Sequence, residues 1–195
     1  KQQATVSGSD ISAEARAKLI ERAVAMARLA PEDPYAGLAD PDRLARGPLP
    51  ELDLYDPAEP DPEALEDQAR ACEDAARAVP GVTNSQGASS SYSSSQWRLA
   101  TSGGFNGLHR ASGFSLSAAT IAGEGAAMER GGDHRSVRWR EDLPGAEVIG
   151  TEAGNRAVQR LGARKIESIT APVIFENRLA SSLIGPLIGA ISGAA

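Results

Sequence analysis

The fold is decided by residues 82–121, which read VTNSQGASSSYSSSQWRLATSGGFNGLHRASGFSLSAATI. The segment Ser85 to Ser95 holds seven serines and little charge, and it runs directly into Trp97 and Leu99. Short apolar and serine-rich runs separated by glycine turns are typical of an antiparallel meander. We therefore predict a hairpin turn over Ser102 to Gly107, further turns at the glycines after residue 122, and strands near residues 87–101, 108–121, 126–131 and 134–140.

Amphipathic helices are expected on both sides of this region. Residues 13–30 carry apolar side chains at helical spacing, with Ser12 as the N-cap. Asp61-Pro62 starts a second helix, because proline is favoured at the first helical position, and Pro80-Gly81 stops it. A third helix is predicted over residues 146–161, with Gly162 as the C-cap. The predicted fold class is α+β, an antiparallel β-meander packed with amphipathic helices.

The remaining segments are predicted from their turn residues. Gln2 to Val6 reads as a strand, and Pro31 to Pro60 is an irregular connection with seven prolines and eight acidic residues. Two short strands are expected at residues 164–169 and 172–175, and a last helix is expected after an Asn177 cap. The last strand and helix would begin a second domain, so we divide the chain into residues 1–168 and 169–195. Both ends are expected to be cut from a longer protein.

Composition and charge narrow the function classes. The formal net charge is −6, and the densest basic stretch, Arg135 to Arg140, holds three arginines. Nucleic-acid binding needs a basic face, so no direct nucleic-acid partner is expected. The single cysteine cannot form an internal disulfide, which favours a cytoplasmic location. Residues 179–195 lack charge but are interrupted by glycine and proline. We therefore expect this segment to form a buried helix and not to span or bind a membrane.

No catalytic or metal-binding residues are predicted in this chain. His109 and His134 stand apart from each other and from other metal donors, and no Gly-x-Ser-x-Gly motif links a strand to a helix. The glycines at residues 103–107 precede a strand and therefore lack the helix N-terminus of a phosphate-binding loop. Cys72 is interpreted as a small helical core residue, with a thiol pKa raised by its neighbours Glu73 and Asp74.

Several stretches together resemble the TldD/PmbA family, on its PmbA side, which is also called TldE. They occur in order over nearly the whole chain: residues 2–10, 25–28 with 31–38, the serine-rich strand with Val82, Ser85 and Ala88, then residues 100–105, 149–165, 171–175, 183–185 and 190–193. By this resemblance, residues 1–168 are the N-terminal and central α+β domain, truncated at its start, and residues 169–195 begin the C-terminal domain.

The resemblance implies a bacterial cytosolic protein that pairs with a TldD-type subunit to form a metalloprotease. In such a complex the zinc-binding His-Glu-x-x-x-His helix belongs to the TldD-type chain, so no cofactor is expected in this one. The expected function is that of a non-catalytic subunit acting on peptides or small unfolded proteins.

The serine-rich strand and the glycine turn are the candidate site for a peptide or partner. A strand edge can capture an extended peptide by adding it to the sheet. The candidate residues are Ser91, Tyr92, Ser93, Gly103, Gly104 and Phe105, with Phe105 expected to be exposed. Two alternatives stay open: a non-proteolytic interaction protein that modulates DNA gyrase or a toxin–antitoxin system, and an independent hydrolase whose site lies in the C-terminal region.

Overall fold

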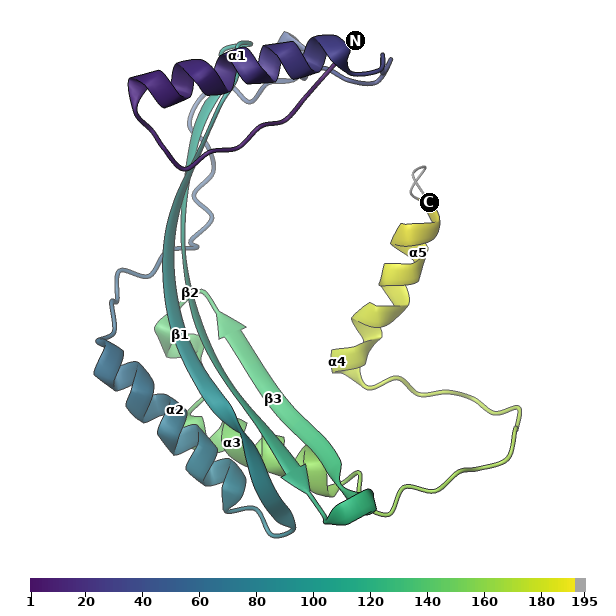
Figure 1. Ribbon diagram of the computed structural model, residues 1–195. Helices are drawn as coiled ribbons and strands as arrows, with labels where there is room; N and C mark the ends of the chain where they lie inside the picture. Colours follow the sequence, from purple (N-terminus) through teal and green to yellow (C-terminus); the bar gives the residue numbers. More distant parts are fainter. Residues whose placement is uncertain (192–195) are drawn as a thin grey trace. The chain divides into compact units, whose positions relative to one another are not determined.

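The computed structural model describes residues 1–191 and contains two compact units, Lys1–Leu161 and Gly162–Ala195. The first unit holds an antiparallel sheet whose three strands run in the order β1 (Val82–Ala100), β2 (Asn106–Ala122) and β3 (Glu129–Val137). Figure 1 shows β1 and β2 as one long, curved hairpin, with helices α2 (Pro62–Arg77) and α3 (Ala146–Val158) beside its lower half. The predicted α+β fold is confirmed, whereas the predicted division at residue 168 stays a prediction.

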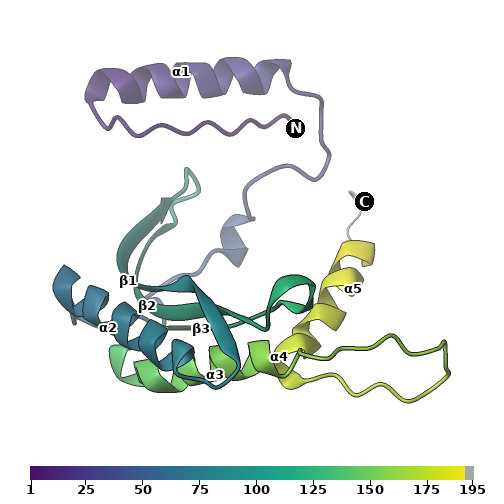
Figure 2. The same cartoon turned by 60° about the horizontal axis from the view of Figure 1, so that its bottom comes forward.

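The sheet is longer on one side than on the other. β1 and β2 pair from Val82 with Ala122 to Ala100 with Asn106, whereas β3 pairs with residues 114–122 of β2. The hairpin therefore continues past β3 as a two-stranded arm. Figure 2 shows α2 and α3 side by side beneath one face of the sheet.

The core between the sheet and these helices is built mostly from small residues. Its buried members are Cys72, Ala76, Leu116, Ala118, Ile149 and Ala153. α2 and α3 approach so closely that a Cβ at Gly150 would lie 2.1 Å from the carbonyl oxygen of Cys72. A chain with three Phe, three Tyr and two Trp can thus form a core, because helices lined by Ala and Gly pack at short distance.

The prediction of four strands is wrong in one place. The segments 126–131 and 134–140, predicted as separate strands, contribute to the single strand β3, and Gly131-Gly132 lies inside it. A Cβ at Gly131 would come within 2.1 Å of the backbone nitrogen of Ala157 in α3. Glycine is needed at this position because a side chain would prevent α3 from approaching the strand. Close approach of another backbone is a common reason for glycine within a strand.

Three further predicted strands are absent from the described structure. Residues 2–6, 164–169 and 172–175 have no strand hydrogen bonding. Gln2 is instead tied to the end of α1 (Ala13–Leu29), since its side-chain amide donates to the carbonyl oxygen of Ala30 at 2.8 Å. A strand needs a neighbour to complete its hydrogen bonds, and among residues 1–191 the sheet consists of β1, β2 and β3.

The predicted helices in the first unit are confirmed. The Ser12 hydroxyl accepts a hydrogen bond from the Ala15 amide at 3.2 Å, and Pro62 opens α2. α3 ends at Val158 with Gln159 as its C-cap, so the predicted end at residue 161 and the predicted C-cap at Gly162 are wrong, although Gly162 has a positive φ of +71°. In the second unit the helix begins one residue earlier than predicted: Glu176 is the N-cap, and Asn177, the predicted cap, is already helical.

The second unit contains α4 (Asn177–Ala180) and α5 (Ile184–Ile191), joined by the 3-10 turn Ser181–Leu183. The predicted continuation of the last helix beyond Ile191 lies outside the described residues. In the described part of the chain, every helix is too short or too polar to cross a membrane. The other 3-10 turns are Pro41–Arg43, Gly125–Ala127 and Arg140–Asp142.

Candidate peptide-binding edge of the sheet

β1 is an edge strand, with β2 as its single sheet neighbour in the described residues. Its first part is irregular: the register shifts between Val82 and Asn84 and again between Ser85 and Gly87. From Ala88 to Gln96 the strand is regular and contains no charge and no proline. Proteins usually protect strand edges with charges, prolines or bulges, and here the bulges end before Ala88. Residues 88–96 therefore offer backbone groups to which an extended chain can pair.

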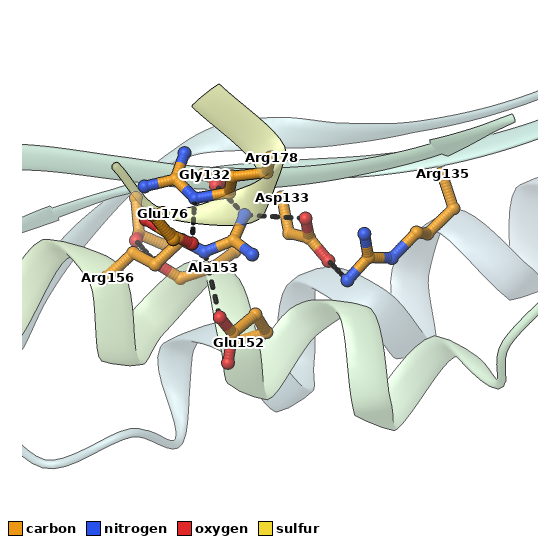
Figure 3. A network of polar contacts seen from close by, with 9 residues as sticks. Gly132, Asp133, Arg135, Glu152, Ala153, Arg156, Glu176 and Arg178 are labelled. Carbon is orange, nitrogen blue, oxygen red and sulfur yellow. Dashed lines mark hydrogen bonds and ion pairs between the residues drawn. The ribbon is translucent and has the colours of Figure 1, made fainter. Parts of the chain in front are cut away.

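The opposite edge of the sheet is protected. β3 carries Asp133 and Arg135, and its Gly132 carbonyl oxygen accepts a hydrogen bond from Arg156 of α3 at 3.0 Å (Figure 3). A charged side chain thus already occupies one backbone acceptor of β3. Of the two edges of the sheet, β1 is therefore more accessible to an added strand than β3.

The free side of β2 along the arm is also covered. The Ser112 amide donates to the Leu54 carbonyl oxygen at 3.0 Å, and the Asp56 amide donates to the Ser112 hydroxyl at 2.9 Å. Beside them the guanidinium of Arg110 stacks over the Tyr55 ring, 3.5 Å from its centroid. The connection before α2 therefore lies against β2 where β3 has ended, which leaves the β1 side of the hairpin open.

Charged residues hold α3 to β3. The buried carboxylate of Asp133 lies 2.6 Å from Nη1 of Arg156 and 3.1 Å from Nη2 of Arg135 (Figure 3). Arg156 also pairs with Glu152 at 2.8 Å. Asp133 thus lies in strand β3, and its carboxylate holds α3 against the sheet.

Three predicted site residues, Ser91, Tyr92 and Ser93, are consecutive on the open edge. The Ser90 hydroxyl donates to Gln68 of α2 at 2.8 Å, so Ser91 and Ser93 face away from the helices. On that face the hydroxyls of Ser91 and Ser115 share a hydrogen bond of 2.7 Å. These serines therefore form a small polar surface beside the edge.

Tyr92 turns to the helix side of the sheet. Its ring lies 5.0 Å from the ring of Phe114, tilted by 40°. Its hydroxyl is buried and has no hydrogen-bond partner within the described part of the chain. A buried hydroxyl without a partner costs free energy, so Tyr92 combines favourable packing with an unmade hydrogen bond.

The other three predicted residues, Gly103, Gly104 and Phe105, form the predicted hairpin turn. Gly104 has a φ of +96°, and the Thr101 amide donates to the Phe105 carbonyl oxygen at 2.9 Å. Phe105 is half-buried rather than exposed, because its ring lies over the Cα of Gly107. The rise of about 3.3 Å per strand residue puts Ser93 about 23 Å from the end of β1, so the structure keeps the two predicted groups apart.

A cavity that sequence reasoning missed lies next to the edge strand. It has a volume of about 230 Å³, is partly enclosed, and touches Ser91 of β1. Its lining comes from β1, β2, the first half of α2 with the residues just before it, and the segment before α3: Pro60, Ala64, Leu65, Gln68, Ser91, Phe114, Arg140 and Leu143. Helical spacing marks Leu65 as a buried residue, but no sequence signal brings Leu143 beside it.

The single cysteine is not a nucleophile. Burial raises the pKa of the Cys72 thiol to about 11, and the negative charge of Asp133 adds to the effect. The direction agrees with the prediction, but the predicted cause, Glu73 and Asp74, is wrong. A protonated, fully buried thiol neither attacks a substrate nor binds a metal ion.

Metal donors are dispersed in the described structure. His134 pairs across the sheet with Ser117, and His109 pairs with Trp97 on the arm. Among residues 1–191, no group of three or more His, Cys, Asp or Glu residues lies close enough to hold a metal ion. We therefore assign no metal-dependent step to these residues.

Comparison with known proteins identifies the family. The model of the PmbA/TldA metallopeptidase central domain matches residues 55–161, which contain the sheet, α2 and α3. Metalloprotease PmbA of Escherichia coli O157:H7 is 37% identical over 193 residues, which cover 97% of this chain and 42% of the relative. The PmbA homolog of Haemophilus influenzae is 31% identical over 99% of this chain and 43% of its own length. The chain thus spans less than half the length of these relatives.

Solved structures share the fold. A candidate modulator of DNA gyrase from Bacteroides thetaiotaomicron superposes with a TM-score of 0.82 at 27% identity, over 97% of this chain and 44% of that one. TldE from Thermococcus kodakarensis has a TM-score of 0.55 at 22% identity, over 79% and 33% of the two chains, and shows the fold alone. With its central domain matched over more than half of its length, the chain is a PmbA/TldE-like member of the PmbA/TldD metalloprotease family.

Proposed function

We propose that this chain is part of the non-catalytic subunit of a two-subunit metalloprotease, and that its β1 edge holds an extended peptide for a TldD-type partner. The partner would supply the zinc site and the hydrolytic step. The observation that carries the proposal is the open edge over Ala88–Gln96, in a sheet whose other edge has a backbone acceptor already occupied by Arg156. Family membership supports the proteolytic context.

Strand addition suits the substrates of such a complex. Backbone pairing recognises any extended chain, because the hydrogen-bonding groups are common to all sequences. Peptides and unfolded segments offer those groups, whereas a folded protein has most of them paired internally. The serines at 89, 91 and 93 keep the neighbouring surface free of bulky side chains that would hinder approach.

Peptidase assays test the division of labour between the subunits. The full-length protein would be assayed alone, with a TldD-type partner, and with that partner carrying Gln in place of the glutamate of its metal motif. Activity only with the intact partner is expected. Activity of this protein alone, lost on chelation, would refute the non-catalytic role.

Backbone methylation tests strand pairing directly. N-methyl groups on alternate residues of a labelled peptide remove the amide donors along one of its two edges, so binding should fall when the blocked amides are those that would face β1. Lysine placed on the edge by Ser93→Lys should also weaken binding. Ser136→Lys is the matched control, since Ser136 is an exposed serine on the protected strand β3. Equal binding by both variants and all peptides would exclude pairing at β1.

A second candidate function is non-proteolytic binding of a regulatory protein. It is favoured by the similarity to the Bacteroides protein described as a candidate modulator of DNA gyrase. In a pull-down with the full-length protein, capture of gyrase or of a toxin–antitoxin component without its cleavage would support this function. Cleavage of captured material in the presence of the TldD-type partner would favour the peptidase complex.

A further inference from the structure

The cavity beside Ser91 lies where a chain added to β1 would send its side chains. Successive residues of a strand point to opposite faces, so every second residue of an added strand projects to the helix side. On that side, next to Ser90 and Tyr92, stand Ala64, Leu65 and Gln68 of α2, which line the cavity. An added strand and the cavity are therefore adjacent.

The lining selects the chemistry of the occupant. Five of the eight lining residues are apolar: Pro60, Ala64, Leu65, Phe114 and Leu143. The side-chain oxygen of Gln68 already accepts a hydrogen bond from Ser90, and the guanidinium of Arg140 belongs to an exposed residue. The cavity floor thus offers apolar contact rather than a partner for a buried charge.

The volume sets the size of the occupant. An apolar cavity of about 150 Å³ is large enough to hold a benzene molecule. At about 230 Å³, this cavity can take a branched aliphatic or a phenyl side chain. An alanine side chain would leave most of it empty, and a carboxylate would lose its water without gaining a buried cation.

We propose that this cavity is a specificity subsite that receives one side chain of leucine or phenylalanine size from an extended peptide paired with β1. The inference rests on the proposed function, because it needs a chain at that edge. It adds the residue class that the peptide must carry at one position. Backbone pairing would give general affinity, and the cavity would choose the register and the sequence.

Peptide binding to the full-length protein in complex with its TldD-type partner tests the subsite. The probes are labelled nine-residue Ser/Thr peptides that differ at the central position, which is Leu, Phe, Ala or Glu. The Leu and Phe probes should bind about tenfold or more tightly than the Ala probe, as expected for several methylene groups in an apolar pocket. The Glu probe should bind no better than the Ala probe.

Two cavity variants and a control locate the effect. Ala64→Phe fills the cavity from an exposed position of α2, and should remove the preference for Leu while the Ala probe binds as before. Ala71→Phe places the same side chain at an exposed position of the same helix outside the cavity, and should keep the preference. Leu143→Ala enlarges the cavity and should shift the preference from Leu toward Phe.

The outcomes separate the two proposals. Equal binding of all four probes, with binding lost on backbone methylation, would overturn the subsite and leave pairing at β1 intact. A Leu preference that survives in Ala64→Phe would also overturn the subsite. If binding ignores backbone methylation as well, both the subsite and the proposed edge function fail.

Discussion

Gly150→Ala tests the close contact of α2 and α3 on which the sheet and its edge depend. The new Cβ would meet the Cys72 carbonyl oxygen at 2.1 Å and the Ala76 backbone nitrogen at 3.0 Å. A Cβ atom essentially never comes closer than 3.0 Å to a heavy atom outside its own and neighbouring residues, so the helices must separate by close to an ångström. The Cys72 oxygen is backbone, so no rotamer change can relieve the clash.

The magnitude follows from two opposing terms. Alanine is favoured over glycine within a helix by about 1 kcal/mol. Overpacking costs about 1–3 kcal/mol and occasionally more, and a backbone clash beside a fully buried core belongs at the upper end. The free energy of unfolding should therefore fall by about 2 kcal/mol, which lowers the Tm by about 4–8 °C in a protein of this size.

Urea denaturation followed by circular dichroism measures this change. Thr151→Ala is the matched control, because it introduces the same residue at the next, exposed position of α3. It should be neutral or slightly stabilising, since alanine has the higher helix propensity. A Gly150→Ala variant within about 0.5 kcal/mol of the unchanged protein would refute the helix contact, because that change is smaller than ordinary overpacking costs.

Three further predictions concern single side chains. The pKa of the Cys72 thiol is raised to about 11 from an ordinary 9.0, so its contribution to stability is complete below pH 9 and is lost as the pH rises toward 11. This loss of stability should disappear in Cys72→Ala when unfolding is measured across the same pH range. An identical pH profile in the variant would contradict the prediction. Tyr92→Phe removes a buried hydroxyl without a described partner and should raise the free energy of unfolding by up to about 1–3 kcal/mol in thermal denaturation, whereas a clear loss would show that the hydroxyl is bonded. Asp133→Ala leaves Arg156 without its buried carboxylate and should cost about 3 kcal/mol in denaturant; a double-mutant cycle with Arg156→Ala should give a favourable coupling, and strict additivity would argue against the ion pair.

Local sequence signals predicted much of the fold because they act over a few residues. Asp61-Pro62 and Pro80-Gly81 bracket α2, since proline fixes its own φ and glycine readily adopts the positive φ of +97° found at Gly81. The turn at Gly103-Gly104 joins β1 and β2 for the same reason. The site predictions at Ser91, Tyr92 and Ser93 lie on an exposed strand edge as expected, and their binding role stays a prediction.

Only the tertiary structure decided features that depend on neighbours distant in sequence. The sequence predicts a turn at Gly131, but the reason for glycine at this position is the close approach of Ala157 in α3. Residues 2–6 have the pattern of a strand, yet a strand exists only where another strand completes its hydrogen bonds. The cavity beside Ser91 is assembled from four separate segments, so no local pattern could announce it. Propensity and turn chemistry are local, whereas packing and edge exposure arise only when the whole chain is assembled.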